Sequence, residues 1–478
     1  MVTRTRFSPS PTGFLHVGGI RTALFSWLLA RQANGQFILR LEDTDKKREV
    51  VGTDRHVMDS LKALGLDYDE GPDKGGPYAP YRQSERLDSY KQWGQKLIDK
   101  GRAYADPYAA SEVQAFRDQA QKDKKPFLYR NHRPNNPPKW DGSRPLRFKS
   151  EPKAYTWHDV VMGDISTGPE VIDDIVLIKS DGYPTYNFAH IIDDQEMKIS
   201  HIVRGQEFLA SVPNYLNLYE ALELVPPIMA TVPHILGPDG NKKLSKRDGA
   251  KDVMDYIHEG YLPQALVSFI ASMGWNDGSE QEVFTTQELI KKFKLDRVQR
   301  SGARFDEKRL LWTNGHFIRE LSLDELYKSA TDFWGPEAKG ADTGYKKQIL
   351  GVVQERLKFF KELPQLTKFF FAISPPSKAG LDELISSSKQ LNKLEASEIK
   401  SLLQRCYDGL NQSDFSVEDL QKRLNNLLEE TAQKPGTLFS IVRIATTWAP
   451  ASPELAGTMA ILGKDLSLQR IQQTIKLL

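Results

Sequence analysis

A short loop near the N-terminus has the residue types that bind phosphate. His16-Val17-Gly18-Gly19 follows a predicted strand and opens a predicted helix, so backbone N–H groups and the positive end of the helix dipole point at whatever occupies the loop. The glycines let the backbone approach a ligand closely, and the imidazole of His16 adds a donor for a phosphate oxygen. Because a histidine before two glycines also suits a plain structural turn, this loop alone does not define a nucleotide site.

A second loop, far along the chain, carries two lysines in a short basic run. Lys243-Leu244-Ser245-Lys246-Arg247 follows the turn-forming segment Gly237 to Asn241. Such a loop can close on a polyphosphate and neutralise charge that develops in the transition state. Taken singly it is equally an exposed basic turn. Both loops in one α/β chain, however, are what the formation of an adenylate from ATP needs.

The elements around the first loop form a β-α-β unit. Thr3 to Phe7 is a predicted strand, and the two prolines of Ser8 to Gly13 prevent it from continuing as helix or ladder. Apolar residues then recur at helical spacing until Asn34-Gly35, and Phe37 to Leu41 alternates as a second strand that ends at the acidic Glu42. This order implies parallel strands joined by a right-handed crossover.

The α/β pattern is interrupted once and then resumes. A proline-rich, basic stretch from about Tyr104 to Ile178, with a strand-like run at Asp174 to Ile178, indicates an insertion. Beyond about Gly249 nearly every pattern is helical. The remaining predicted elements are helices at Thr53 to Leu64, Ser84 to Lys100 and Asn214 to Leu224, and strands at Ile199 to Val203 and Val232 to Leu236.

Length and composition predict a multidomain globular protein. The chain has 478 residues, of which 39% are hydrophobic and 27% charged, with a formal net charge of only +2. It has no apolar run long enough to span a membrane and no signal-like N-terminus, so we expect it in the cytoplasm. Its single cysteine, Cys406, excludes an intramolecular disulfide and is predicted to be a core residue. Basic residues concentrate at 122–149 and at 291–309.

With both loops in place, the sequence resembles the class I aminoacyl-tRNA synthetases. His16 to Gly19 is similar to their HIGH signature, and Lys243 to Arg247 to their KMSKS signature. Further segments narrow the resemblance to glutamyl-tRNA synthetases of the bacterial or organellar type, over essentially the whole chain. These segments are Ser8 to Gly13, Leu41 to Asp45, Tyr81 to Arg86 and Ser180 to Tyr186.

The resemblance implies an α/β fold with a Rossmann-type parallel-sheet catalytic domain, and it implies activation of glutamate with ATP and transfer to the terminal adenosine of tRNA. Two carboxylates and one ammonium on the substrate call for cationic and acidic partners. The implied glutamate site is Arg6, Ser8, Ser10, Glu42, Tyr186 and Arg204, and the role of His190 is left open. The implied ATP site is His16, Gly18, Gly19, Lys243, Ser245 and Lys246, with His16, Lys243 and Lys246 catalytic and Mg²⁺ on the phosphates.

The resemblance also implies a domain layout and a tRNA surface. The layout is a catalytic domain in two halves (1–104 and 191–250), an acceptor-end insertion (105–190), a stem-contact domain (251–321) and a helical anticodon-binding domain (322–478). Some relatives hold zinc in the insertion with cysteines, which this insertion lacks, so no structural zinc is expected. The partner is tRNA(Glu), with tRNA(Gln) left open, and a monomer is expected. Candidate tRNA contacts are Arg130, Arg133, Arg147, Arg297, Arg300 and Arg356.

Alternatives differ in what accompanies the two loops. A glutaminyl enzyme would carry C-terminal β-barrels, and a truncated relative that modifies a tRNA base would lack the helical C-terminal region. A small nucleotidyltransferase would need fewer residues. A non-catalytic RNA-binding module would have no reason to combine His16, Glu42 and Lys246.

Overall fold

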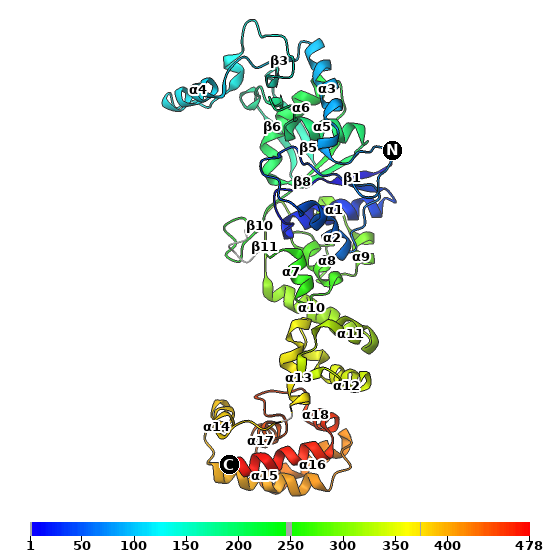
Figure 1. The fold of residues 1–478 in the computed structure, drawn as a ribbon, viewed down its shortest axis with the longest axis vertical. Coiled ribbons are helices and arrows are strands. Elements are labelled where there is room, and N and C mark those ends of the chain that lie inside the picture. Colours follow the sequence, from blue (N-terminus) through cyan, green and yellow to red (C-terminus); the bar gives the residue numbers. More distant parts are fainter. Residues whose placement is uncertain (1, 245–250, 373) are drawn as a thin grey trace. The chain divides into compact units, whose positions relative to one another are not determined.

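The chain folds into two compact units. The computed structural model describes residues 2–244, 251–372 and 374–478. One unit comprises Met1–Ile257 with Pro263–Glu307, and the other comprises His258–Leu262 with Lys308–Leu478 (Figure 1). The first unit is α/β, and the described elements of the second are α-helices and short 3₁₀ turns, as the sequence predicts.

The predicted β-α-β unit at the N-terminus is present. Strands β1 (Arg4–Phe7) and β2 (Gln36–Leu39) are parallel neighbours joined through helix α1 (Val17–Gln32). The turn into β2 requires glycine, because a Cβ on Gly35 would lie 2.1 Å from the carbonyl oxygen of Thr3. The preceding residue, Asn34, adopts the left-handed conformation with a φ of 50°. The helix therefore stops where the sequence predicts and returns the chain beside β1.

A second set of strands brings a distant part of the chain beside β1. Strands β8 (His201–Gly205) and β9 (Ile228–Val232) are parallel, in a sheet of order β6-β5-β9-β8. The Ser200 amide donates to the Arg4 carbonyl at 2.9 Å, which holds the start of β8 against β1. The carboxyl ends of β1 and β8 consequently lie side by side, and this is the edge at which parallel α/β sheets bind ligands.

The predicted strand from Val232 to Leu236 is wrong as a single element. β9 ends at Val232 because Pro233 has no N–H to continue the ladder. A separate strand, β10 (Ile235–Leu236), pairs in parallel with β11 (Ala303–Arg304) instead. Other predicted elements exist with shifted bounds: β8, α6 (Val212–Ala221), and α3 (Leu87–Asp99), which is preceded by a 3₁₀ turn at Gln83–Glu85.

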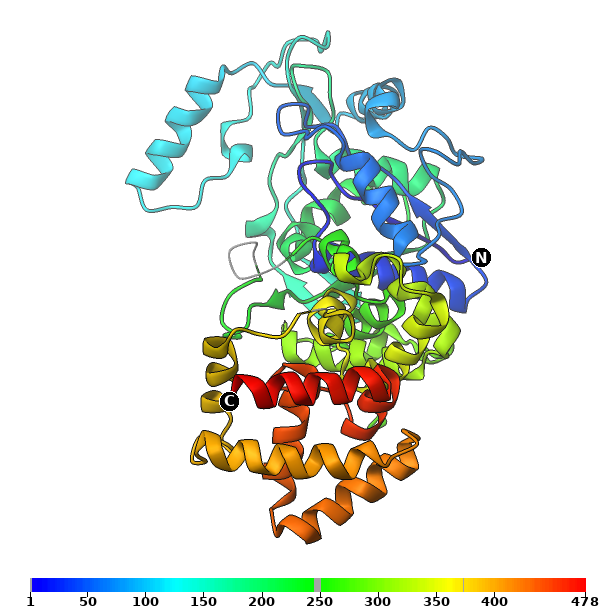
Figure 2. The ribbon, with the colours of Figure 1, turned by 60° about the horizontal axis from the view of Figure 1, so that its bottom comes forward.

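The predicted insertion contains two kinds of structure. Strands β5 (Tyr155–Asp159) and β6 (Gly163–Thr167) extend the sheet of β8 and β9. The rest of the insertion is a separate antiparallel sheet and a helix with its loop. The helix and its loop stand away from the sheets in both ribbon views (Figures 1 and 2). The strands of this sheet and the helix are β3 (Ala103–Ala105), β4 (Leu146–Phe148), β7 (Val176–Ile178) and α4 (Ala110–Lys122).

Helices complete the first unit and build the second. The first unit adds α2 (Thr53–Ala63), α5 (Tyr186–Glu196), α7 (Val253–His258), α8 (Pro263–Ser272) and α9 (Thr286–Lys292). The later helices are α10 (Glu307–Glu320), α11 (Leu323–Ala330), α12 (Thr343–Val353), α13 (Leu363–Phe371), α14 (Lys378–Ser387), α15 (Ala396–Asn411), α16 (Val417–Thr431), α17 (Pro435–Thr447), α18 (Leu455–Leu462) and α19 (Lys464–Leu477). None of the helices in the described ranges is long and apolar enough to cross a membrane.

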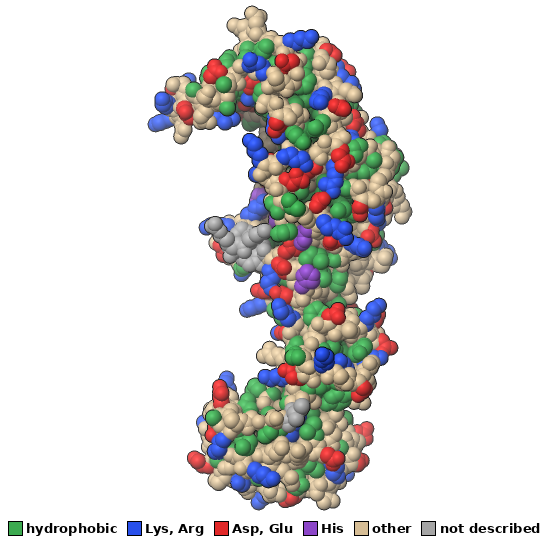
Figure 3. All heavy atoms as spheres, in the orientation of Figure 1, with side chains coloured by type: hydrophobic (Ala, Val, Ile, Leu, Met, Phe, Trp, Pro, Cys, Tyr) green, Lys and Arg blue, Asp and Glu red, His purple; other side chains and the backbone are tan. Residues whose placement is uncertain are grey.

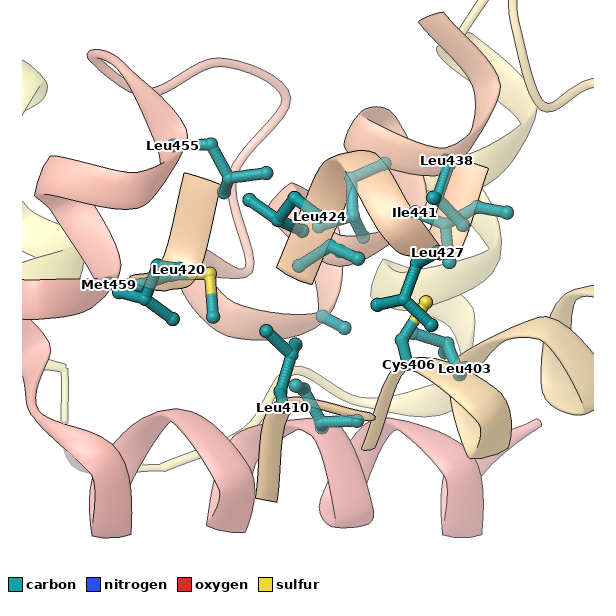
Figure 4. Close-up of a cluster of buried hydrophobic side chains, with 14 of the residues drawn as sticks. Leu403, Cys406, Leu410, Leu420, Leu424, Leu427, Leu438, Ile441, Leu455 and Met459 are labelled. Carbon is teal, nitrogen blue, oxygen red and sulfur yellow. The ribbon is translucent and has the colours of Figure 1, made fainter. Parts of the chain in front are cut away.

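The core of the C-terminal helices is a cluster of buried apolar side chains from α14 to α19, half of them leucines (Figure 4). Helix α19 runs alongside α15 (Figure 2). Cys406 is fully buried in this cluster, as predicted, and burial raises the pKa of its thiol to about 12. One charged side chain shares this region: Arg470 is buried and donates to the carbonyl oxygens of Phe369 and Thr446, both at 2.9 Å. Its charge faces the carboxyl ends of two helices, α13 and α17, where the helix dipole is negative.

Candidate active site

A cavity of about 620 Å³ opens at the carboxyl ends of β1 and β8. Its walls come from the loop after β1, the start of α1, the residues after β2 and the loops after β8 and β9. Ser245 and Lys246 lie outside the described residues. The other predicted residues of the glutamate and ATP sites all line this one cavity: Arg6, Ser8, Ser10, His16, Gly18, Gly19, Glu42, Tyr186, Arg204 and Lys243.

His16 is held in one orientation at the start of α1. It is the N-cap residue, and its Nδ1 accepts a hydrogen bond from the Gly18 amide at 3.1 Å. An accepting Nδ1 leaves the proton of a neutral imidazole on Nε2, so His16 can act as a donor. A Cβ on Gly18 would lie 3.0 Å from the ring, and one on Gly19 would lie 2.7 Å from the side chain of Leu15. Glycine at both positions therefore lets the ring and the loop pack closely.

Lys243 enters the cavity from the second loop. Its ammonium lies 3.3 Å from a carboxylate oxygen of Glu207. Burial tends to raise the pKa of Glu207, but hydrogen bonding to the backbone and Lys243 lower it overall. The carboxylate therefore stays charged and gives Lys243 a partner that a phosphate would have to replace.

A chain of buried charges connects Arg6 with Glu42. Asp194, on α5, accepts from Nε of Arg6 at 3.1 Å and from the guanidinium of Arg40 at 2.7 Å. Arg40 in turn donates to Glu42 at 3.1 Å. Asp193 adds a third carboxylate, 3.6 Å from Nε of Arg40. The two ends of the predicted glutamate site are thus fixed by one continuous network beneath the cavity floor.

The network sets the charge states of its members. Burial raises the pKa of Glu42 to about 7, although Arg40 and Arg6 oppose the shift. Burial also acts to raise the pKa of Asp194, but Arg6 and Arg40 outweigh it and hold that pKa at about 2. For Arg40, burial disfavours the charge, yet Asp194, Asp193 and Glu42 together raise its pKa. Asp194 is therefore ionised, and it compensates the charge of Arg6.

Arg204 differs from Arg6 in having no acidic partner among the described residues. It is only 4% exposed, and within the described residues no carboxylate forms an ion pair with it. Its guanidinium lies over the ring of Tyr215 at 5.2 Å, and its Nη2 contacts the sulfur of Met229 at 3.5 Å. Its Nε has no hydrogen-bond partner in the part of the chain that the structure describes. A buried cation without a counter-ion is costly, so this wall of the cavity attracts an anion.

Tyr186, which lines the cavity, stacks on the ring of His190. Their rings lie 4.7 Å apart, and Nδ1 of His190 is 2.7 Å from the carbonyl oxygen of Tyr186. Burial lowers the pKa of His190 to about 3, so the ring is neutral at physiological pH. Burial also raises the pKa of Tyr186, which keeps its hydroxyl protonated and able to donate. His190 therefore supports Tyr186 without adding charge.

Comparison with known proteins agrees with this geometry. Residues 2–312 match the family described as "tRNA synthetases class I (E and Q), catalytic domain", and residues 325–475 match "Anticodon binding domain". The glutamate–tRNA ligase of Dehalococcoides mccartyi is 38% identical over 99% of this chain and 97% of its own length. The chain belongs to the glutamate–tRNA ligase family of class I synthetases.

Further members of the glutamate–tRNA ligase family match from end to end. The glutamate–tRNA ligase of Moorella thermoacetica is 36% identical over 99% of this chain and 98% of its own. A crystal structure of a glutamate tRNA ligase from Elizabethkingia meningosepticum, solved in complex with its amino acid, superposes with a TM-score of 0.87 at 32% identity and covers 100% of this chain and 99% of its own. The predicted family and fold class are confirmed.

Three predicted tRNA contacts in the insertion of this glutamate–tRNA ligase family member are engaged within the protein. Arg130 donates to the carbonyl oxygen of Pro169 at 2.8 Å, and Arg133 pairs with Asp174 at 2.5 Å. Arg147 pairs with Asp106 at 2.5 Å and lies 3.4 Å above the ring of Tyr129. Over the face drawn in Figure 3, Lys and Arg side chains are interspersed with Asp and Glu rather than forming one continuous basic surface. Part of the positive charge of residues 122–149 is therefore neutralised by carboxylates within the insertion.

The remaining predicted tRNA contacts have different surroundings. Nε of Arg300 donates to the carbonyl oxygen of Val161 at 3.1 Å, and Arg297 packs over Gly278, where a Cβ would lie 2.2 Å from its guanidinium. Arg356 is exposed at the end of a 3₁₀ turn that follows α12. Burial and the charge of Arg356 lower the pKa of Arg443, so two cations lie near each other in the C-terminal unit. For all six arginines the tRNA role stays a prediction.

Sequence reasoning missed the residues beneath the cavity. Arg40 and Asp194 do not touch the open volume, yet they hold Glu42 and Arg6. A signal was available: Arg40 is a charged residue inside the apolar run Phe37 to Leu41, and Asp193-Asp194 follows two isoleucines. Buried charges need partners, but the sequence does not say which charge meets which.

Proposed function

We propose that glutamate and ATP react in the cavity at the ends of β1 and β8, giving glutamyl-adenylate and pyrophosphate. The glutamyl group then passes to the 3′-terminal adenosine of tRNA(Glu), with release of AMP. Glutamate–tRNA ligase activity follows from the chain's membership in this family over its full length. What we add is an assignment of roles to the residues of this cavity.

One observation supports the amino-acid assignment above the others. Three buried arginines line the cavity. Arg6 is compensated by Asp194, and Arg21 donates to the carbonyl oxygens of Met273 and Pro233, whereas Arg204 has neither a carboxylate nor a carbonyl partner in the described part of the chain. A bound glutamate supplies the missing negative charge with its side-chain carboxylate, and Glu42 supplies the acceptor for its ammonium group. Ser8 and Ser10 line the same cavity and would give hydroxyl groups to the polar ends of the substrate.

The ATP end of the cavity is the start of α1. The helix N-terminus and the donor proton on Nε2 of His16 favour phosphate oxygens there, and Gly18 and Gly19 leave room for them. Lys243 would exchange Glu207 for phosphate, and Ser245 and Lys246 would join it from the same loop. The attacking carboxylate is already ionised, so these cations act by stabilising the charge that passes to pyrophosphate.

Mg²⁺ belongs to this proposal as a companion of ATP. The described residues contain no group of three or more His, Cys, Asp or Glu side chains placed to hold a metal ion. The ion would therefore be carried mainly by the phosphate oxygens. Structural zinc remains unexpected because the insertion has no cysteine.

We propose the five-part domain layout, a monomeric state and a cytoplasmic location together with this function. The match of residues 325–475 to an anticodon-binding domain supports placing the anticodon on the C-terminal helices. Charging of tRNA(Gln) as well is an open part of the proposal, and Arg356 is the residue we expect to sense the difference. Binding of both tRNAs to Arg356→Gln tests this: a preference equal to that of the parent removes the role from Arg356.

Pyrophosphate exchange tests the proposed function directly. The protein should exchange pyrophosphate into ATP with glutamate, and added tRNA should be required or strongly stimulate the exchange. Glutamine should not support it, because its neutral amide leaves Arg204 without a counter-ion. Exchange driven by glutamine, or no exchange with folded protein and tRNA, would contradict the proposal.

A further inference from the structure

A histidine outside the cavity, His56, connects helix α2 with the segment at Asp252, and both contact the loop that carries His16. His56 lies on α2, and its Nε2 is 2.8 Å from a carboxylate oxygen of Asp252. The two side chains are 17% and 16% exposed, so water screens the pair only in part. Neither residue lines the cavity.

Asp252 lies against the loop that carries His16. The two residues form an antiparallel backbone bridge, and the Val253 amide approaches the Leu15 carbonyl oxygen at 3.5 Å. The other carboxylate oxygen of Asp252 accepts from the Met254 amide at 2.8 Å. One carboxylate therefore fixes both the turn into α7 and, through His56, the distance to α2.

Helix α2 also holds the loop before His16 from its own side. The ring of Phe14 meets the ring of His56 edge-on at 4.9 Å. The hydroxyl of Thr53 lies 3.1 Å from the Pro11 carbonyl oxygen and also contacts the carbonyl oxygen of Val50, and the Val50 amide donates to the Pro11 oxygen at 2.9 Å. The segment from Pro11 to His16 is thus fastened to α2 at two points and to Asp252 at a third.

We infer that His56 is a positioning residue for ATP: its bond to Asp252 closes a clamp that holds His16 and the start of α1 in register with the phosphates. This inference rests on the proposed function of the cavity. With its proton on Nε2, the ring donates to Asp252, so the clamp needs only this donor and its reach. A displacement of a reacting group by about 1 Å lowers rates by as much as about 100-fold.

The clamp predicts a loss that is selective for ATP. His56→Leu removes the donor and should lower kcat/KM for ATP in pyrophosphate exchange by about tenfold. The KM for glutamate should change by less than about twofold, because Arg6, Glu42 and Arg204 do not touch the clamp. His56→Gln, whose side-chain amide can reach Asp252, should recover most of the loss.

The same helix offers a matched control. Arg55 pairs with Asp59 at 3.1 Å on an exposed face of α2, so Arg55→Leu removes an ion pair without touching the clamp and should behave as the parent protein. Asp252→Asn keeps an oxygen for Met254 and loses the carboxylate, and combined with His56→Leu it should add no further loss. Asp252→Asn also gives the measurement if His56→Leu does not fold.

The outcomes separate the inference from the function beneath it. An active parent whose His56 variants keep the parental kcat/KM for ATP overturns the clamp alone. Equal losses for ATP and glutamate, accompanied by a lower melting temperature and no recovery in His56→Gln, also overturn it, since they show a merely structural histidine. A parent with no glutamate-dependent exchange overturns the proposed function and the clamp with it.

Discussion

Replacing Arg204 by methionine tests the charge balance of the cavity. The substitution removes a guanidinium that is 4% exposed and has a sulfur at 3.5 Å and a tyrosine ring at 5.2 Å, but no acidic partner among the described residues. When glutamate binds, its carboxylate completes a buried, charge-assisted pair. Losing one partner of such a pair costs about 3 kcal/mol. At about 1.4 kcal/mol for each factor of ten, kcat/KM for glutamate should fall by about 150-fold.

The same substitution should not destabilise the free protein. An uncompensated buried cation opposes folding, so Arg204→Met should melt at the parental temperature or above it. Arg204→Lys keeps the charge but loses the planar, forked geometry and should recover only part of the activity. The assay is tRNA-supported pyrophosphate exchange over a range of glutamate and glutamine concentrations, with melting curves of each variant without substrate.

Two results would refute this reasoning. A lower melting temperature with an unchanged KM for glutamate would mean that Arg204 is a structural residue. A loss of activity that is equal for glutamate and ATP would mean that the cavity has deformed. The ratio of kcat/KM for glutamate to kcat/KM for glutamine should also fall in Arg204→Met, because the neutral amide of glutamine forms no charge pair that the substitution could remove.

Three more predictions follow from buried or cationic groups. Asp194 has a pKa of about 2 against a usual 3.8, so its contribution to stability is present above the higher value and is lost as the pH falls through the lower one. In acid urea titrations over that range, the free energy of unfolding of the parent should fall by about 2 kcal/mol more than that of Asp194→Asn. Equal losses would contradict a stabilising role of the network. Arg470→Met leaves the carbonyl oxygens of Phe369, Thr446 and Ala372 without their donor. The substitution should lower the free energy of unfolding by about 3 kcal/mol, which should appear as faster amide hydrogen exchange in α13 and α17. Parental exchange rates would contradict this stabilising role of Arg470. Lys246→Ala should slow adenylation and leave tRNA affinity nearly intact in filter binding, whereas a large loss of tRNA binding would make the loop a tether.

The sequence by itself determined much of the catalytic half. The end of β1 at Phe7, the loop with His16 and the helix after it are local features, because they depend on the alternation of side chains, on prolines and on glycines within a few residues of each other. The second strand is present too, but it ends at Leu39 rather than at the predicted Leu41. The family resemblance added the glutamate and ATP residues, and those in the described chain line one cavity. Pro233, which separates β9 from β10, is a local signal against the single predicted strand from Val232 to Leu236.

Only the tertiary structure decided which charges are compensated. Asp194 meets Arg6 across 188 positions of sequence, and no local spacing encodes that pairing. The basic run at 122–149 is predicted to bind RNA, and two of its members, Arg133 and Arg147, have carboxylate partners in the loops beside β7 and β3. A charged residue has the same letter whether it faces water, a ligand or a buried carboxylate. Its electrostatic role depends on burial and on neighbours brought together by folding, as Arg6 and Arg204 show in the same cavity.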